Sequence, residues 1–267
     1  MEIRGSGGCG YNRRMDARGY GWKPDAHDPR DLRYAPPPHL LRALPPAVDL
    51  RRHCPAAYDQ LSLNSCVANA VAAALEFEQV RQGERKATPS RLFLYYNARV
   101  LEGLTKQNHG VQIRYGIKAV AKQGACEEIH WPYHVHHFAK QPPKKLYAAA
   151  RQHRAMRYFR MRRSLEHLHA CLAEGYPFIF GMSVYSQFES ARVRRTGTVA
   201  LPGKHEKRVG GHAVLAVGYS HARRRFLVRN SWGQDWGQGG YFTIPYGFLK
   251  DPRLAKNFWT IRWVGTS

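Results

Sequence analysis

Long apolar runs are missing from this sequence of 267 residues, although 43% of its residues are hydrophobic. No window approaches the roughly 20 consecutive apolar residues that a membrane-spanning helix needs. The N-terminus, MEIRGSGGCGYNRRMDARGYGW, carries charge but lacks the apolar segment of a secretory signal peptide. We therefore expect a globular protein that stays in the cytoplasm or is exported by a route that does not read such a signal.

Cysteine pairs with metal-ligand spacing are also missing. The five cysteines are Cys9, Cys54, Cys66, Cys126 and Cys171, and no two of them form a CxxC motif. No metal site is therefore expected. Cys54 and Cys126 could pair in an oxidising compartment, whereas free thiols are the expectation in the cytosol.

Acidic residues are scarce, because 19 Asp and Glu stand against 42 Lys and Arg, and the net charge is +23. Such a balance favours acidic partners, and it is equally typical of a solvated basic surface. No zinc-finger spacing, RNA-binding aromatic pair or basic heptad accompanies the charge. We therefore expect no specific nucleic-acid binding.

The chain divides into an N-terminal extension and one folded unit. Residues 1–47 are rich in glycine and proline and show few periodic apolar positions, which predicts an extended arm. Residues 48–267 place helical patterns first and strand patterns later, which predicts an α+β fold with two lobes and a cleft between them. We expect a left lobe over about 48–140 and a right lobe over about 141–267.

Helices are expected in the first part of the folded unit and strands in the second. Helical patterns cover Val67–Arg81, Pro89–Leu101, Gly110–Lys122, Lys144–Tyr158 and Ser164–Glu174. Strand patterns cover Pro177–Tyr185, Val193–Leu201, His212–Tyr219, Arg225–Asn230 and Gly240–Ile244. The helix from Val67 is alanine-rich and mostly apolar, which predicts a central helix that is buried on nearly all sides.

Cys66 directly precedes that helix, a position that favours a reactive thiol. The thiolate is the nucleophile, and a free thiol with a pKa near ~8.5 is mostly protonated at neutral pH. The positive end of a helix dipole lowers this pKa, and Asn64 or Ser65 could cap the helix and fix its start. Cys66 is therefore the candidate nucleophile.

His212 is the candidate base for the proton of this thiol. It follows Gly210 and Gly211, which have no side chain and let a substrate backbone approach closely. Asn230 ends the next strand, where its carbonyl could hold the imidazole in one orientation, although asparagine is also common in plain turns. Trp232 could shield the hydrogen bond between His212 and Asn230 from water.

Gln60 lies six residues before Cys66 and completes this set. Its side-chain N–H could stabilise the oxyanion of a tetrahedral intermediate, beside the backbone N–H of Cys66. The four residues supply a nucleophile, a base, a group that orients the base and an oxyanion donor.

These motifs resemble those of the papain family of cysteine peptidases over most of residues 48–267. The resemblance rests on GGHAVLAVGY from Gly210, RNSWGQDWGQGGYF from Arg229 and the spacing of Gln60 and Cys66. It implies a helical left lobe that carries the cysteine and a β-barrel-like right lobe that carries the histidine and asparagine. It also implies hydrolysis of peptide bonds in protein or peptide substrates through an acyl-enzyme, without metal or organic cofactor.

The sequence departs from the familiar family pattern in two places. Around the nucleophile it reads LNSCV rather than C-G-[SA]-C-[WY], so the upstream cysteine and the following aromatic are absent. Of the glycine pair that lines the substrate cleft in the family, Gly110 is the candidate here. These features resemble a bacterial branch of the family.

The arm is too short and too proline-rich to be the family's long helical propeptide. It could still cross the cleft and restrain activity, with Trp22 presented to a subsite, or it could pack on the back of a lobe. Two further functions remain open beside peptide hydrolysis. One is acyl transfer with the same thiolate and histidine, and the other is a catalytically silent binding protein on this fold.

Overall fold

The protein is described from a computed structural model over residues 19–84 and 87–265. The α-helices are α1 (Pro38–Arg42), α2 (Cys66–Arg81), α3 (Arg91–Val100), α4 (Ile113–Gln123), α5 (Lys144–Ala150), α6 (Leu165–Ala173), α7 (Ala191–Thr196) and α8 (Tyr246–Lys250). The strands are β1 (Trp22–Lys23), β2 (Ala47–Asp49), β3 (Val111–Gln112), β4 (Arg154–Arg160), β5 (Phe178–Tyr185), β6 (Arg208–Ser220), β7 (Arg225–Arg229), β8 (Tyr241–Pro245) and β9 (Ala255–Gly265). No described helix has the length and apolar character needed to cross a membrane.

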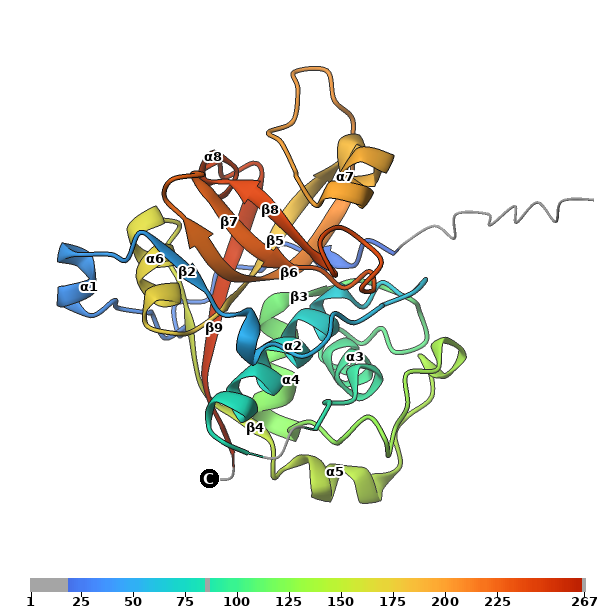
Figure 1. The fold of residues 1–267 in the computed structure, drawn as a ribbon. Helices are drawn as coiled ribbons and strands as arrows, with labels where there is room; N and C mark the ends of the chain where they lie inside the picture. The colour runs from blue at the N-terminus through green and yellow to red at the C-terminus, as the bar shows by residue number, and fades with distance from the viewer. Residues whose placement is uncertain (1–18, 85–86, 266–267) are drawn as a thin grey trace, which may run out of the picture.

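One lobe is built on a seven-stranded sheet, the upper part of Figure 1. Its strand order is β4-β9-β5-β6-β7-β8, and β2 pairs with β6 as an additional edge. Every pairing in this sheet is antiparallel. Among the described strands the order does not return on itself, so this lobe is an open sheet and not a closed barrel.

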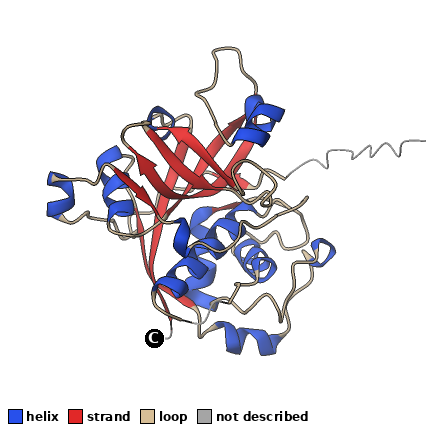
Figure 2. Cartoon of the chain, in the orientation of Figure 1, coloured by secondary structure: helices blue, strands red, loops and turns tan. Residues whose placement is uncertain are grey.

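The other lobe is a group of helices around α2, below the sheet in Figures 1 and 2. All residues of α2 from Cys66 to Gln79 are buried, because α3, α4, β6 and β9 pack around the helix. Gly116 of α4 lies directly against Val67 and Val71 of α2, where its missing side chain permits close packing. The expected central buried helix and the α+β class are confirmed.

Two of the expected elements are wrong. The helix expected over Lys144–Tyr158 ends at Ala150, and residues 154–160 form β4 instead. β4 pairs with β9, a strand that the sequence patterns did not indicate. Helix propensity is a weak preference, and pairing with a distant strand overrides it here.

The strand expected over Val193–Leu201 is wrong, because its first four residues belong to the short helix α7 and the rest lie in no named strand. The Ser190 side chain accepts a hydrogen bond from the Val193 N–H and caps its start. Gly197, with a φ of 60°, follows its last residue in the left-handed conformation. A serine cap and a terminal glycine are ordinary helix signals that the strand interpretation overlooked.

The described part of the arm runs across both lobes before the folded unit begins. β1 pairs in parallel with β3, with Trp22 opposite Val111 and Lys23 opposite Gln112. Further along, Tyr34 pairs its backbone with Arg160 of β4. The arm therefore packs as part of the fold from Gly19 onward, and residues 1–18 lie outside the described range.

Candidate active site

Cys66 is brought to the sheet by the packing of α2 against β6. It is the first residue of α2, and its side chain is fully buried. The backbone N–H of Ala213 in β6 donates to the Cys66 sulfur at 3.4 Å. The residue directly before Ala213 is His212, so two candidates that lie 146 positions apart in sequence meet at this junction.

The start of α2 is not capped as expected. Ser65 occupies the N-cap position, but its side chain makes no capping hydrogen bond. Its hydroxyl instead bonds the Tyr133 hydroxyl at 2.6 Å and the Asn69 side chain at 3.0 Å. Asn64 directs its side-chain N–H to the Asn108 carbonyl. The first turn of α2 therefore keeps backbone N–H groups near the Cys66 sulfur.

His212 and Asn230 form the hydrogen bond that the sequence predicted. The distance from His212 Nε2 to Asn230 Oδ1 is 2.8 Å, and both residues are buried. The Ser231 N–H donates to the same Oδ1 at 2.9 Å and fixes the amide. The Trp232 ring lies 5.3 Å from the imidazole at an interplanar angle of 36° and helps to exclude water. With Nε2 held by Asn230, Nδ1 is the ring nitrogen left to face other groups.

Gln60 is fixed by the loop that carries Asn230. The Ser231 hydroxyl donates to Gln60 Oε1 at 2.7 Å, and the Gln60 N–H donates to the Ser231 carbonyl. Gln60 Nε2 donates to the carbonyls of Leu63 and Gly19, each at 2.9 Å. Its donor is therefore rigidly placed, and a carbonyl of the arm engages it.

Gly110 and Gly211 lie where the arm passes through the site. The Val111 N–H donates to the Gly21 carbonyl at 2.8 Å, and a Cβ at Gly110 would overlap the backbone of Gly21. A Cβ at Gly211 would lie 2.8 Å from the carbonyl oxygen of Trp22. Both glycines permit a close backbone approach.

Four contacts of the arm were not foreseen from the sequence. The Gly21 backbone N–H bonds the Cys66 sulfur, and Gly19 engages Gln60. The Tyr20 ring lies 6.3 Å from the His212 ring, and its hydroxyl donates to Glu189. The signal in the sequence was the pair of glycines on either side of Tyr20. Such a segment fits a narrow passage, but the sequence does not indicate which residues it contacts.

Burial raises the pKa of the Cys66 thiol to about 11. Backbone N–H groups of Ala213, Gly21 and Val67 oppose this shift by stabilising the thiolate. Burial has the larger effect, so the covered site favours the protonated thiol at neutral pH. The arm therefore lies over a Cys66 whose ionisation is disfavoured by burial.

The other described cysteines lie elsewhere and are free, as is Cys66. Cys171 of α6 has its sulfur against the Tyr176 carbonyl and the Arg262 guanidinium. Cys54 bonds the Leu50 carbonyl. Cys66 is therefore the cysteine that the fold brings to the His212 strand, and the described residues contain no cluster of side chains suited to a metal ion.

The raised pKa predicts how the thiol reacts in the full chain. Alkylation of Cys66 by iodoacetamide should be slow at neutral pH and should accelerate as the pH rises toward about 11, because the thiolate is the reactive species. Peptide-resolved mass spectrometry of the labelled protein measures this rate against pH.

The matched control is the same chain unfolded in urea, in which the reactivity should follow an ordinary thiol pKa of roughly 8.5. An apparent pKa well below that value in the folded full chain would contradict the prediction. It would show that the thiol ionises beneath the arm.

Known proteins match the chain over most of its length. A family model described as papain family cysteine protease matches residues 44–258. An uncharacterized peptidase C1-like protein, L477 of Acanthamoeba polyphaga mimivirus, is 41% identical over 215 residues, which are 77% of this chain and 69% of that protein.

Solved structures agree with these matches. Xylellain, a cysteine protease from Xylella fastidiosa, is 39% identical, with a TM-score of 0.88 over 96% of this chain and 98% of that one. Digestive procathepsin L 3 of the Tenebrio molitor larval midgut has a TM-score of 0.69 over 91% and 75% of the two chains, and at 17% identity it supports the fold alone. The papain-like fold expected from the sequence is confirmed, and the chain belongs to the papain family of cysteine proteases.

Proposed function

We propose that this peptidase uses Cys66 as its nucleophile and His212 as its base. The observation that carries the proposal is the junction of α2 and β6, where the Ala213 N–H bonds the Cys66 sulfur beside the His212–Asn230 pair. His212 Nδ1 takes the thiol proton, and Asn230 keeps the ring oriented and stabilises the imidazolium.

The reaction then follows acyl transfer through sulfur. The Cys66 sulfur attacks the carbonyl carbon of the scissile bond, and the oxyanion accepts hydrogen bonds from Gln60 Nε2 and the Cys66 N–H. His212 gives the proton to the leaving amine, which leaves a thioester on Cys66. Water, deprotonated by His212, hydrolyses the thioester and restores the thiol.

The arm occupies this site as an internal competitor. Gly19 supplies a carbonyl to Gln60 Nε2, the donor that the oxyanion would use. Gly21 presents an N–H group to the Cys66 sulfur, and an N–H group is not an electrophile. The arm thus engages the polar groups of the site that a substrate would use, which supports inhibition.

Trp22 fills a pocket that we assign to a substrate side chain. Its side chain is only 7% exposed, and a Cβ at Gly181 would overlap its indole ring. The pocket lies beside Gly211 and opposite Val111, the residue that pairs with Trp22. Gly110 and Gly211 would then line the substrate path, with Trp232 covering the catalytic hydrogen bond.

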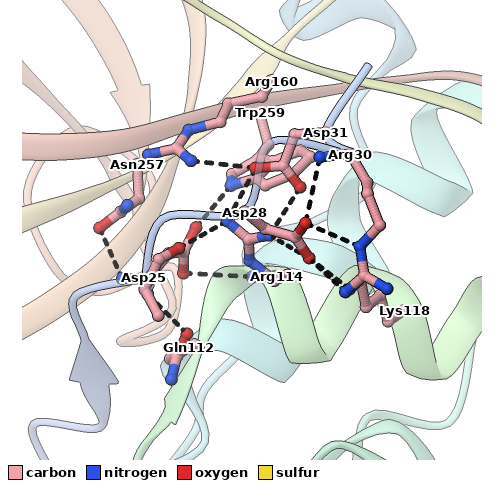
Figure 3. Close-up of polar contacts among 11 residues, drawn as sticks. Asp25, Asp28, Arg30, Asp31, Gln112, Arg114, Lys118, Arg160, Asn257 and Trp259 are labelled. Atoms are coloured by element: carbon pink, nitrogen blue, oxygen red, sulfur yellow. Dashed lines mark hydrogen bonds and ion pairs between the residues drawn. The ribbon is translucent and has the colours of Figure 1, made fainter. Parts of the chain in front are cut away.

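A cluster of carboxylates holds the next part of the arm in place (Figure 3). Asp31 bonds both terminal nitrogens of Arg114 at 2.7 Å and one of Arg160 at 2.9 Å. Asp25 accepts hydrogen bonds from the Trp259 indole at 2.7 Å and from the Arg114 backbone at the start of α4. These buried contacts make the seated arm an ordered inhibitor.

These contacts support a division into an inhibitory extension, residues 1–47, and a peptidase domain, residues 48–267, with its lobes meeting near residue 140. The net charge of +23 supports a preference for acidic substrate segments, which salt would weaken because exposed charges are screened over roughly 10 Å. Specific nucleic-acid binding is not part of the proposal.

The catalytic assignment is tested by substitution at Cys66 and Gln60. Cys66→Ala should abolish hydrolysis of fluorogenic dipeptide amides, and Gln60→Ala should lower kcat on the order of a hundredfold because one oxyanion donor is lost. Cys54→Ala, which removes a free cysteine away from the site, is the control and should keep full activity.

The outcomes separate the open alternatives. Labelling of Cys66 by iodoacetamide without hydrolysis of the dipeptide amides would indicate a narrower range of substrates or acyl transfer. If neither labelling nor hydrolysis is detected in any variant, the result favours a binding protein.

Inhibition by the arm is tested at Trp22. Trp22→Ala should raise hydrolysis by the full chain about tenfold or more, because removal of a buried tryptophan destabilises the seated arm by several kcal/mol. Trp263→Ala removes a tryptophan that is 48% exposed on β9 and should leave the rate unchanged. Equal rates in the wild type and both variants would show that the arm does not limit access.

The pocket of Trp22 also predicts substrate preference. In the Trp22→Ala background, peptides with an aromatic residue two positions before the scissile bond should have kcat/KM values roughly tenfold above those with alanine there, because an aromatic side chain buries more apolar area. Adding Gly181→Ala should remove this advantage, since the new Cβ occupies the space of the ring. Equal kcat/KM values across the panel would contradict the assignment.

A further inference from the structure

A second site lies beside the arm, where the surface forms an open cavity of about 490 Å³. Its walls come from three segments that are far apart in sequence, namely the arm, the turn between β4 and α6, and the start of β9. The lining residues are Pro24, Asp25, Arg33, Arg160, Met161, Arg162, Arg163, Lys256, Asn257 and Phe258. The volume is in the range of small-molecule sites, which run from roughly 300 to 1,000 Å³.

Positive charge dominates this cavity. Five of its lining residues are arginine or lysine, and Asp25 is the one carboxylate among them. Arg33, Arg162 and Lys256 are exposed, and within the described residues no carboxylate pairs with any of the three. Positively charged side chains lie together here without the carboxylates that pair with arginines elsewhere in the chain, as Asp31 pairs with Arg114.

The two remaining arginines are partly engaged. Arg160 is half-buried and donates from Nη1 to Asp31 at 2.9 Å (Figure 3), which leaves its other terminal nitrogen without a side-chain hydrogen-bond partner among the described residues. Arg163 acts on Asp251, which is already paired with Arg253 at 2.6 Å. The Asp25 carboxylate accepts hydrogen bonds from the Trp259 indole and the Arg114 backbone, and it also interacts electrostatically with Arg160.

Backbone hydrogen bonds fix the three walls to one another. Arg160 exchanges hydrogen bonds with the arm, from its N–H to Leu32 and from the Tyr34 N–H to its own carbonyl. The Met161 N–H donates to the Phe258 carbonyl of β9. Asn257 has a φ of 57° and turns its side chain to accept the Asp25 N–H at 3.0 Å. The cations are therefore presented by a preformed frame and not by a mobile surface.

We propose that this cavity binds a small molecule that carries at least two phosphate groups. Guanidinium groups bind phosphate oxygens through paired hydrogen bonds, and Lys256 adds a point charge from β9. A concave site lined by one sign of charge focuses its field on an anion. A single phosphate would engage only part of the set, whereas linked phosphates span cations supplied by the arm and by both body segments.

Isothermal titration of the full chain with inorganic tripolyphosphate at constant ionic strength tests this proposal. We expect saturable binding at one site. Arg162→Gln combined with Lys256→Gln should weaken it roughly tenfold or more, because charge-assisted hydrogen bonds are the strong ones. Arg33→Gln should also weaken it, since the arm supplies that cation. An unchanged thermal midpoint shows that each variant is folded.

The matched control removes two charges at a distance from the cavity. Arg192 and Arg195 are exposed on α7, and their double glutamine variant should bind tripolyphosphate within about twofold of the wild type if binding is local. Equal weakening in both double variants would overturn the proposal in favour of a general effect of the net charge. Absence of saturable binding, or equal binding of citrate, would overturn the phosphate site.

Discussion

The contact between α2 and β6 is the interaction on which the rest of the structure depends. It joins the start of a helix in one lobe to a central strand of the other, through the Ala213 N–H and the Cys66 sulfur. Because α2 is buried along nearly its whole length, its position is set by the packing of both lobes. The geometry of the proposed site is therefore a property of the whole fold, and a local change in either lobe that moves α2 would move Cys66.

The residues of the site were predictable because their local signals are strong. Cys66 stands at the start of an apolar helical run, and His212 stands in a long apolar strand directly after two glycines. Their meeting followed from the resemblance and not from spacing, since 146 residues separate them. Gln60 was predicted as an oxyanion donor. The hydrogen bond from Ser231 that holds its side chain depends on a loop contact that no pattern in the sequence indicates.

The errors at β4 and β9 have a common physical cause. Residues 154–160 have a helix-compatible composition, and they form β4 because β9 offers a partner in the sheet. β9 itself, residues 255–265, was missed although it contains several apolar residues, because the consecutive apolar pairs Phe258–Trp259 and Trp263–Val264 depart from a strict alternation. Long-range pairing decides such segments, and a single sequence carries little information about it. The sequence left open whether the arm crosses the cleft or packs on the back of a lobe, for the same reason. Trp22 is an aromatic residue in an extended segment, and the pocket that it fills is formed by glycines far away in the sequence.

The arm links the active site to the basic cavity over a very short distance. Trp22 lies in the proposed substrate pocket, and Asp25, three residues later, lies in the cavity wall. Burial raises the pKa of the Asp25 carboxyl, so a seated arm favours the protonated form. Acidification therefore strengthens this anchor, and the anchor weakens as the pH rises through the raised pKa. Asp25 does not act as an acid-triggered release. For the inhibition proposed above, release of the arm would then require competition for its contacts, either in the Trp22 pocket or at the cations around Asp31.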